Sequence, residues 1–171
     1  FTLPEQPNSI PYLTSYYTQN WGFCMSHNDF LSLHDDEYFV KIDSEHKNGS
    51  LTYGEYLIKG KSKETILIST YVCHPSLCND NLSGVVLATF LAEHLSKEKN
   101  LDYSIKFLFI PETIGAITWL AQNEDNIRDI RHGLVATCVG DSGSLTYKKS
   151  RDGNNMIDKV VEEVLSESGQ S

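Results

Sequence analysis

A histidine and an aspartate, His74 and Asp80, follow a run of apolar and β-branched residues at 65–72. This run predicts a strand that is buried on both faces, as in a parallel α/β sheet. Polar residues that follow such a strand lie at its carboxyl end, where open α/β sheets bind their ligands. An imidazole nitrogen and carboxylate oxygens are ligand types that suit zinc. The pair therefore predicts a metal site at the end of this strand.

Two further acidic residues stand in equivalent places downstream. The apolar run at 103–110 predicts a second strand, and Glu112 follows it directly. The pattern repeats over 133–141, where a third apolar run leads to Asp141. The amphipathic run at 85–95 predicts a helix after the first strand. We expect Glu112 and Asp141 to lie in the same crevice as the first pair.

These motifs resemble those of the zinc aminopeptidases in the co-catalytic, α/β/α exopeptidase superfamily, and more closely its aminopeptidase-like branch associated with polysaccharide biosynthesis. The segment 80–84, Asp-Asn-Leu-Ser-Gly, is similar to the family's Asp-Asn-x-Ser-Gly. The segment 109–115 is similar to its Glu-Glu-x-Gly region. The resemblance implies an α/β fold of three layers with a mixed, mainly parallel sheet. It also implies zinc held by His74, Asp80 and Asp141, and Glu112 as the general base of amide hydrolysis.

The sequence departs from the family pattern at two positions. Thr113 takes the place of the second glutamate, and a threonine hydroxyl binds zinc poorly. Ser76 takes the place of the aspartate that orients the first histidine, a kind of partner that tunes metal affinity by about 10–100-fold. The family also supplies one more ligand histidine, which we expect beyond Ser171. The sequence leaves open whether one or two zinc ions bind, and we expect this chain alone to be inactive.

Other readings of the same residues remain open. Asp80 and Asn81 would equally serve as a helix cap, and Glu112 as an acid favoured at a helix start. Cys73 and Cys138 fall in or beside apolar runs, which favours reduced thiols packed as small hydrophobes. For function, the rivals to a peptidase are an amidohydrolase acting on N-acylated sugars or glycans and a catalytically inactive binding module.

Composition narrows the class of protein. The chain has 171 residues and a formal net charge of −9, which argues against nucleic acid as a partner. No apolar run approaches the roughly 20 residues of a membrane span, and residues 1–5 lack the features of a signal peptide. We therefore expect a cytoplasmic protein, and the resemblance implies a peptide or another small amide-bearing molecule as its substrate. An apolar sheet edge would favour a homo-oligomer.

The chain divides into two parts by pattern. Residues 1–60 are rich in proline and aromatic residues, and two alternating stretches predict a β-hairpin over 37–59. The resemblance implies that 1–60 form the end of an inserted β-rich domain and that 61–171 form a partial zinc aminopeptidase-like domain. The run at 156–165 predicts a final amphipathic helix.

Overall fold

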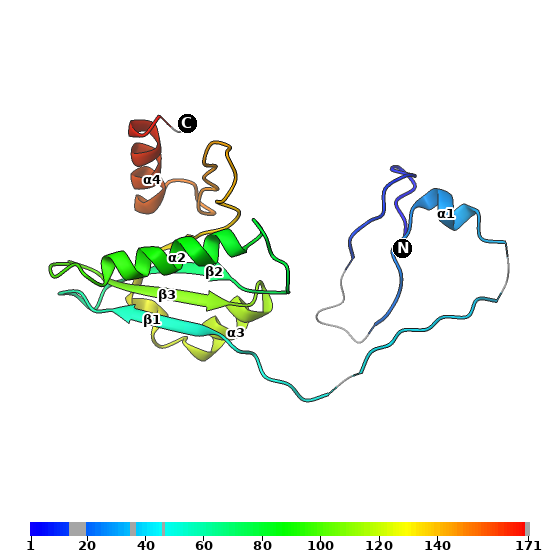
Figure 1. The fold of residues 1–171 in the computed structure, drawn as a ribbon, viewed down its shortest axis with the longest axis horizontal. Helices are drawn as coiled ribbons and strands as arrows, with labels where there is room; N and C mark the ends of the chain where they lie inside the picture. Colours follow the sequence, from blue (N-terminus) through cyan, green and yellow to red (C-terminus); the bar gives the residue numbers. More distant parts are fainter. Residues whose placement is uncertain (14–19, 35–36, 46, 170–171) are drawn as a thin grey trace. The chain divides into compact units, whose positions relative to one another are not determined.

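The computed structural model describes residues 1–13, 20–34, 37–45 and 47–169. The chain forms two compact units, Phe1–Lys47 and Asn48–Ser171. The described part of the smaller unit contains one helix, α1 (His27–Leu31), and no strand (Figure 1). Helix α1 begins after Ser26, whose hydroxyl accepts a hydrogen bond of 3.0 Å from the Asp29 amide. The described residues of this unit carry no strand. The inserted β-rich domain that the resemblance implies stays a prediction.

The predicted hairpin over 37–59 is wrong for the part of the chain that the structure describes. Its first half contains no strand there, and Phe39 is 94% exposed. Its second half forms β1 (Gly54–Ile58), which pairs antiparallel with β3 (Ser104–Ile110). Alternation alone does not fix a strand, because the strand also needs apolar surface to cover. Ile58 finds that surface in the core of the larger unit.

The larger unit is built on a four-stranded mixed sheet with the order β1-β3-β2-β4. Strand β2 (Thr65–Tyr71) lies between β3 and β4 (Ile130–Val135) and runs parallel to both. The register pairs Tyr71 with Ile110, so β2 and β3 end side by side. The sequence therefore predicted three parallel strands correctly. Their carboxyl ends lie at one edge of the sheet.

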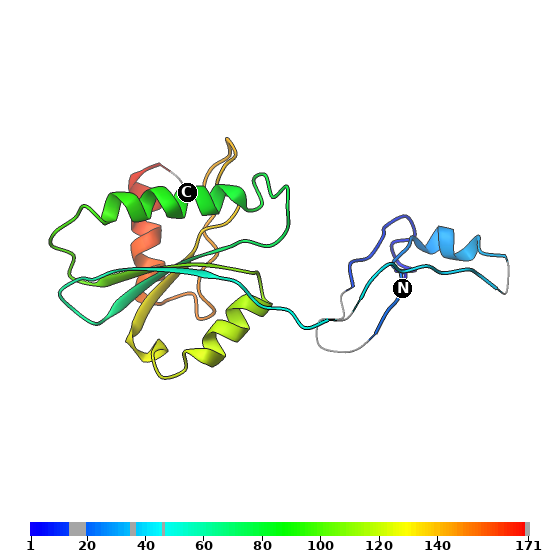
Figure 2. The ribbon, with the colours of Figure 1, turned by 60° about the horizontal axis from the view of Figure 1, so that its bottom comes forward.

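Helices cover both faces of this sheet (Figure 2). Helix α2 (Leu82–Leu95) packs Ala88 and Ala92 against Phe107 on one face. Helix α3 (Ile114–Gln122) packs Trp119 against Leu108 on the other. Neighbouring residues of β3 serve opposite faces because side chains alternate along a strand. The chain thus has a mixed α/β fold, as predicted.

Two further elements complete the unit. A 3₁₀-helix, η1 (Ile127–Asp129), leads into β4, and the final helix α4 (Met156–Glu167) contacts β4. None of the helices in the described part of the chain has the length and apolar character that crossing a bilayer requires.

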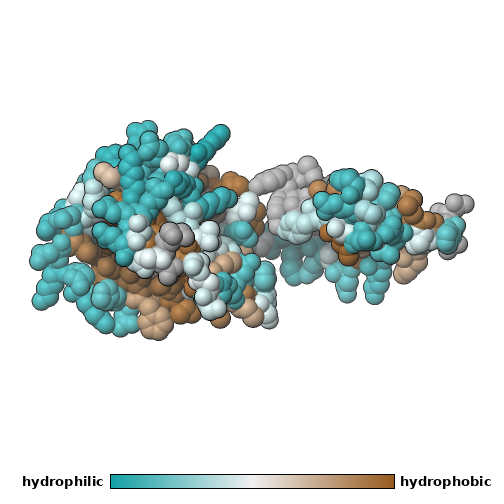
Figure 3. Space-filling model, turned by 90° about the horizontal axis from the view of Figure 1, so that it is seen from above, coloured by the Kyte–Doolittle hydropathy of each residue, from teal (hydrophilic) through white to brown (hydrophobic). Residues whose placement is uncertain are grey.

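Both covering helices also expose apolar side chains. On α2, Leu82, Val86 and Phe90 are 51%, 45% and 65% exposed and recur every fourth residue, which places them on one side of the helix. Figure 3 shows hydrophobic residues gathered over part of the surface of this unit. Contiguous exposed apolar surface commonly marks an interaction site. The prediction of a homo-oligomer stays a prediction.

A buried carboxylate anchors helix α4. Asp158 has no exposed surface, and its oxygens accept hydrogen bonds from the amides of Ser150 and Asn155, both at 2.8 Å. They also accept from the hydroxyls of Ser150 and Tyr147, at 2.5 and 2.9 Å. These donors, those of Ser150 foremost, hold the pKa of Asp158 well below its usual range. The carboxylate thereby ties the segment before α4 to the first turn of the helix.

We predict that Asp158→Asn lowers the midpoint of urea unfolding at neutral pH. A depressed folded-state pKa contributes stability that is present above the unfolded pKa of about 3.9 and is lost as pH falls through the lower folded value. The difference between wild type and variant should therefore shrink as the pH is lowered below about 5. Asp152→Asn, at an exposed aspartate, is the matched control and should change little. A difference that stays constant down to pH 2 would contradict this reading.

Candidate hydrolase site at the carboxyl edge of the sheet

Three loops meet the carboxyl edge of the sheet. Residues 72–81 follow β2, residues 111–113 follow β3, and residues 136–143 follow β4. Because β2 lies between the other two strands, its loop is the central one. His74 and Asp80 are in the central loop, Glu112 is in the second and Asp141 is in the third. All four predicted residues therefore belong to loops at the same edge.

A buried carboxamide joins the central loop to the third one. Asn81 has no exposed surface, and its Nδ2 donates to Thr70 Oγ1 at 2.8 Å and to the Ala136 carbonyl at 3.2 Å. Its Oδ1 accepts from the Cys138 amide at 3.1 Å. Asn81 occupies the N-cap position of α2, but its side chain makes no capping hydrogen bond. The side chain binds the strand ends together instead.

A second set of hydrogen bonds reaches Asp141. Asn79 Oδ1 accepts from the Gly140 amide at 2.8 Å, and Asn79 Nδ2 lies 3.3 Å from Asp141 Oδ2. The Ser83 hydroxyl donates to the Asn79 carbonyl at 2.6 Å and accepts from the Val139 amide at 3.0 Å. The loop that carries Asp80 thus holds the loop that carries Asp141.

Close packing at the start of α2 depends on Gly84. A Cβ atom there would lie 2.4 Å from the Ala136 carbonyl oxygen and 2.7 Å from Thr70 Oγ1. Only glycine lets the helix approach these groups. The glycine of the 80–84 motif therefore has a packing role beside the network of Asn81.

Asp80 is held by a tyrosine from the preceding strand. The Tyr71 hydroxyl donates a hydrogen bond to Asp80 Oδ1 and lies 2.8 Å from Thr137 Oγ1. Burial, together with this hydrogen bond to the carboxylate, raises the pKa of Tyr71 to about 12. Tyr71 therefore remains a neutral donor throughout the physiological range. It fixes one oxygen of Asp80.

His74 is oriented by the backbone. Its Nδ1 lies 2.8 Å from the Pro75 carbonyl oxygen, which can only accept a hydrogen bond. A hydrogen bond to this oxygen requires the proton on Nδ1, and in the neutral imidazole this tautomer has its lone pair on Nε2. Metal-binding histidines are commonly held this way by a carbonyl. The Pro75 carbonyl thus orients the His74 ring, the role that an aspartate has in the family at the position of Ser76.

Glu112 is linked to the central loop through its backbone. Its amide donates to Cys73 Sγ at 3.3 Å. The side chain is exposed and has no hydrogen bond or ion pair within the described ranges. Such a carboxylate is available to accept a proton.

The predicted metal ligands do not form one close cluster among the described residues. Within residues 1–13, 20–34, 37–45 and 47–169, no group of three or more His, Cys, Asp or Glu side chains lies close enough to hold a metal ion. The donor chemistry of one imidazole and two carboxylates nevertheless fits zinc, and both His74 and Asp80 have an orienting partner. The assignment of His74, Asp80, Asp141 and Glu112 stays a prediction.

The cysteines of this region are exposed. Strands β2 and β4 end at Tyr71 and Val135, so Cys73 and Cys138 lie in the loops rather than in the sheet. The prediction that they pack as small hydrophobes is wrong. The apolar runs that contain them continue past the ends of the strands. All four cysteines are free thiols.

Unfavourable backbone conformations gather in the same loops. Among the described residues, the non-glycine positions with positive φ are Ser76, Cys78, Thr113 and Cys138, with φ between 47° and 60°. A β-branched residue such as Thr113 at φ 55° is uncommon, because its side chain crowds the backbone. Conformations of this kind cost about 1–3 kcal/mol each and concentrate at functional sites.

Residues that support the site were harder to find from sequence than the site residues themselves. Tyr71 and Thr70 look like ordinary strand residues, and their contacts with Asp80 and Asn81 span the loop. Asn79 has a weak signal, because it precedes the acidic motif in a run of polar residues. The hydrogen bonds between the central loop and residues 136–141 can be predicted only when the strand order is known.

We predict that Asn81→Ala lowers the free energy of unfolding by about 2–4 kcal/mol, because it leaves buried donors and acceptors without partners. Asn100→Ala, at an exposed asparagine, should stay within about 0.5 kcal/mol of wild type. Urea denaturation followed by circular dichroism measures both. A loss at Asn81 no larger than that of the control would show that the carboxamide is dispensable.

We predict that Thr113→Gly raises the free energy of unfolding by about 1 kcal/mol, since relief of the backbone strain exceeds the entropy lost with glycine. Ala116→Gly, at an exposed position inside α3, should lower it by about 1 kcal/mol. Thermal and urea unfolding of the two variants would give opposite signs. If both variants are destabilised, Thr113 is not strained.

The sequence of this chain is similar to those of known proteins. The profile of a protein family described as a domain of unknown function, DUF4910, matches residues 2–171. A protein of Clostridium acetobutylicum with the provisional name polysaccharide biosynthesis protein with aminopeptidase-like domain is 58% identical over 168 residues. That alignment covers 98% of this chain and 38% of the relative.

A solved structure is also similar. It is the crystal structure of a protein from Clostridium acetobutylicum, provisionally described as a peptidase, with a TM-score of 0.73 and 57% sequence identity. The match covers 100% of this chain and 40% of that one. The chain therefore spans well under half the length of these relatives.

Proposed function

Because the chain belongs to the family described as a domain of unknown function, DUF4910, and its relatives carry peptidase-like names, we propose that it forms part of an aminopeptidase-like hydrolase of amide bonds. The observation that carries the proposal is the joining of three polar loops at the carboxyl edge of β2, β3 and β4. Open α/β sheets bind ligands at this edge.

In this proposal His74, Asp80 and Asp141 would hold a zinc ion. Zinc there would supply Lewis-acid chemistry toward the amide carbonyl and toward water. The chain's own residues prepare the ligands. The Pro75 carbonyl presents His74 Nε2, and Tyr71 holds one oxygen of Asp80 while the other has no hydrogen-bond partner among the described residues.

Glu112 is proposed to accept a proton from water and pass it to the leaving nitrogen. Its carboxylate is exposed and unengaged among the described side chains, as a general base needs to be. Its amide donates to Cys73 Sγ, which ties the segment after β3 to the loop that carries His74 and Asp80. The strained backbone of Thr113 would aim this segment.

A second candidate substrate class has one supporting observation. The Clostridium acetobutylicum relative carries a name that includes polysaccharide biosynthesis. An amidohydrolase that acts on N-acylated sugars would use the same residues. Parallel assays of aminoacyl anilides and N-acetyl sugars on the complete gene product would separate the two, because each class of substrate requires its own binding walls.

We predict that Glu112→Gln keeps zinc binding but reduces amide hydrolysis by about 10²–10⁴-fold, the usual contribution of a general base. His74→Ala should abolish zinc binding, because it removes the one nitrogen ligand proposed. Calorimetry with zinc tests binding on this chain, and turnover is measured on the complete gene product.

His94→Ala is the matched control for the histidine change, since His94 is exposed in the last turn of α2. It should bind zinc as the wild type does. Near-normal turnover in Glu112→Gln, or loss of zinc binding by that variant, would show that Glu112 is not the general base. Equal loss of zinc binding in His74→Ala and His94→Ala would show that His74 is not a specific zinc ligand.

A further inference from the structure

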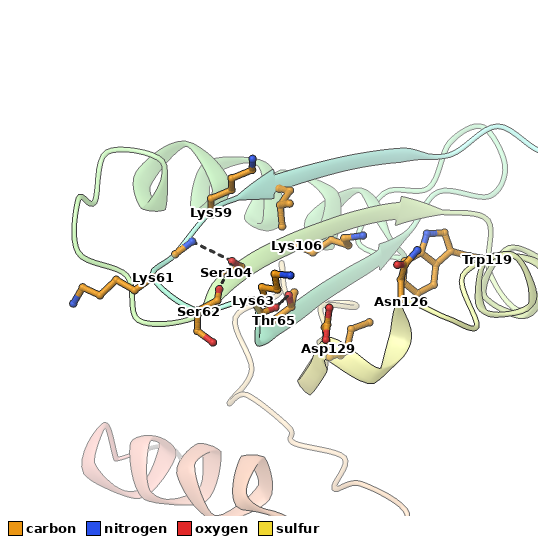
Figure 4. Close-up of a pocket in the computed structure, with 13 residues that line it drawn as sticks. Lys59, Lys61, Ser62, Lys63, Thr65, Ser104, Lys106, Trp119, Asn126 and Asp129 are labelled. Atoms are coloured by element: carbon orange, nitrogen blue, oxygen red, sulfur yellow. Dashed lines mark hydrogen bonds between the residues drawn. The ribbon is translucent and has the colours of Figure 1, made fainter.

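A pocket of about 570 Å³ lies at the opposite edge of the sheet from the proposed hydrolase site. The residues that follow β1 and those that begin β2, β3 and β4 line it (Figure 4). Its volume falls in the range of small-molecule sites. It is separate from the three loops described above, and nothing in the proposed hydrolase function uses it.

The pocket is unusually basic for this protein. Four lysines line it, Lys59, Lys61, Lys63 and Lys106, against one acidic residue, Asp129. Two of the lysines have acidic partners beyond the lining, since Lys61 pairs with Asp102 at 2.8 Å and Lys106 lies 3.8 Å from Glu55. The balance remains positive in a chain whose formal net charge is −9.

Three donors that face the pocket lie on different elements, and two of them, Lys63 and Asn126, have no polar side-chain partner among the described residues. Lys63 precedes β2 and has no carboxylate within ion-pair distance among the described residues. Lys106 comes from the middle of β3, with its Nζ 5.4 Å from the centre of the Trp119 ring. Asn126 stands just before η1, and its side-chain amide has no hydrogen-bond partner in the described part of the chain.

Neighbouring hydroxyls, in contrast, are already engaged. Ser104 Oγ accepts from the Gly60 amide at 3.1 Å and donates to the Ser62 carbonyl at 2.8 Å. Thr65 Oγ1 donates to the Lys63 carbonyl at 2.9 Å. These bonds hold the pocket wall in shape. The Lys63 ammonium and the Asn126 side-chain amide have no such partner among the described residues, and Lys106 has only the 3.8 Å contact with Glu55.

We infer that this pocket binds the phosphate group of a phosphorylated small molecule, through Lys63, Lys106 and Asn126. Lysine ammonium groups bind phosphate as point charges, and a phosphate monoester offers more negative charge to two lysines than a carboxylate does. Phosphate alone would leave much of the volume empty. A phosphorylated sugar or a molecule of similar size fits the pocket better.

Nuclear magnetic resonance titration of this chain with inorganic phosphate, at constant ionic strength with chloride, tests the inference. We expect saturable shifts of the Lys63 and Asn126 amides with millimolar affinity. Lys63→Gln should weaken binding about two- to fivefold, the effect of one exposed charge pair. Asp129→Asn should strengthen it by a similar factor, because it removes a repelling carboxylate from the lining.

Lys97→Gln is the matched control, because Lys97 is exposed just after α2 and pairs with Glu93. It should leave phosphate affinity unchanged. Glucose 6-phosphate, added as a second probe, should shift the same amides at lower concentration. Non-saturable shifts, or equal weakening by Lys97→Gln and Lys63→Gln, would overturn the site. Both readouts are independent of hydrolase activity, so failure here leaves the proposed function standing.

Discussion

The buried carboxamide of Asn81 is the interaction on which the edge of the sheet depends. Its hydrogen bonds to Thr70, Ala136 and Cys138 join the end of β2 to the segment after β4. A buried amide that satisfies several partners fixes geometry, because any displacement leaves polar groups unpaired in a low dielectric. Asn81 therefore joins the two loops that carry Asp80 and Asp141, and the hydrogen bonds of Asn79 and Ser83 reinforce that link.

Support for the proposed site comes from ordinary groups arranged around that anchor. Tyr71 fixes an oxygen of Asp80, the Pro75 carbonyl fixes the tautomer of His74, and Asn79 reaches Asp141. Each contact restricts a side chain that would otherwise sample several rotamers. The strained positions in the same loops show that the surrounding contacts over-determine the backbone. Such rigidity is what a metal site or a catalytic edge requires.

The sequence predicted the three parallel strands and helices α2 and α4 because their apolar patterns are strong and local. It failed at the hairpin over 37–59, where alternation gave no information about the partner strand, and β1 paired with β3 instead. It placed the four site residues in loops at one edge, but the contacts of Asn81 and Asn79 with the segment after β4 join residues more than 50 positions apart. Strand order decides such contacts. Local pattern does not contain it.

The central claim is that His74, Asp80 and Asp141 together hold zinc at this edge. Crystals of the chain soaked in zinc, measured on both sides of the zinc absorption edge, test it most directly. The account predicts an anomalous peak bonded to His74 Nε2 and to carboxylate oxygens of Asp80 and Asp141, at about 2.0–2.2 Å. A structure at saturating zinc with no peak in contact with these three residues would contradict it.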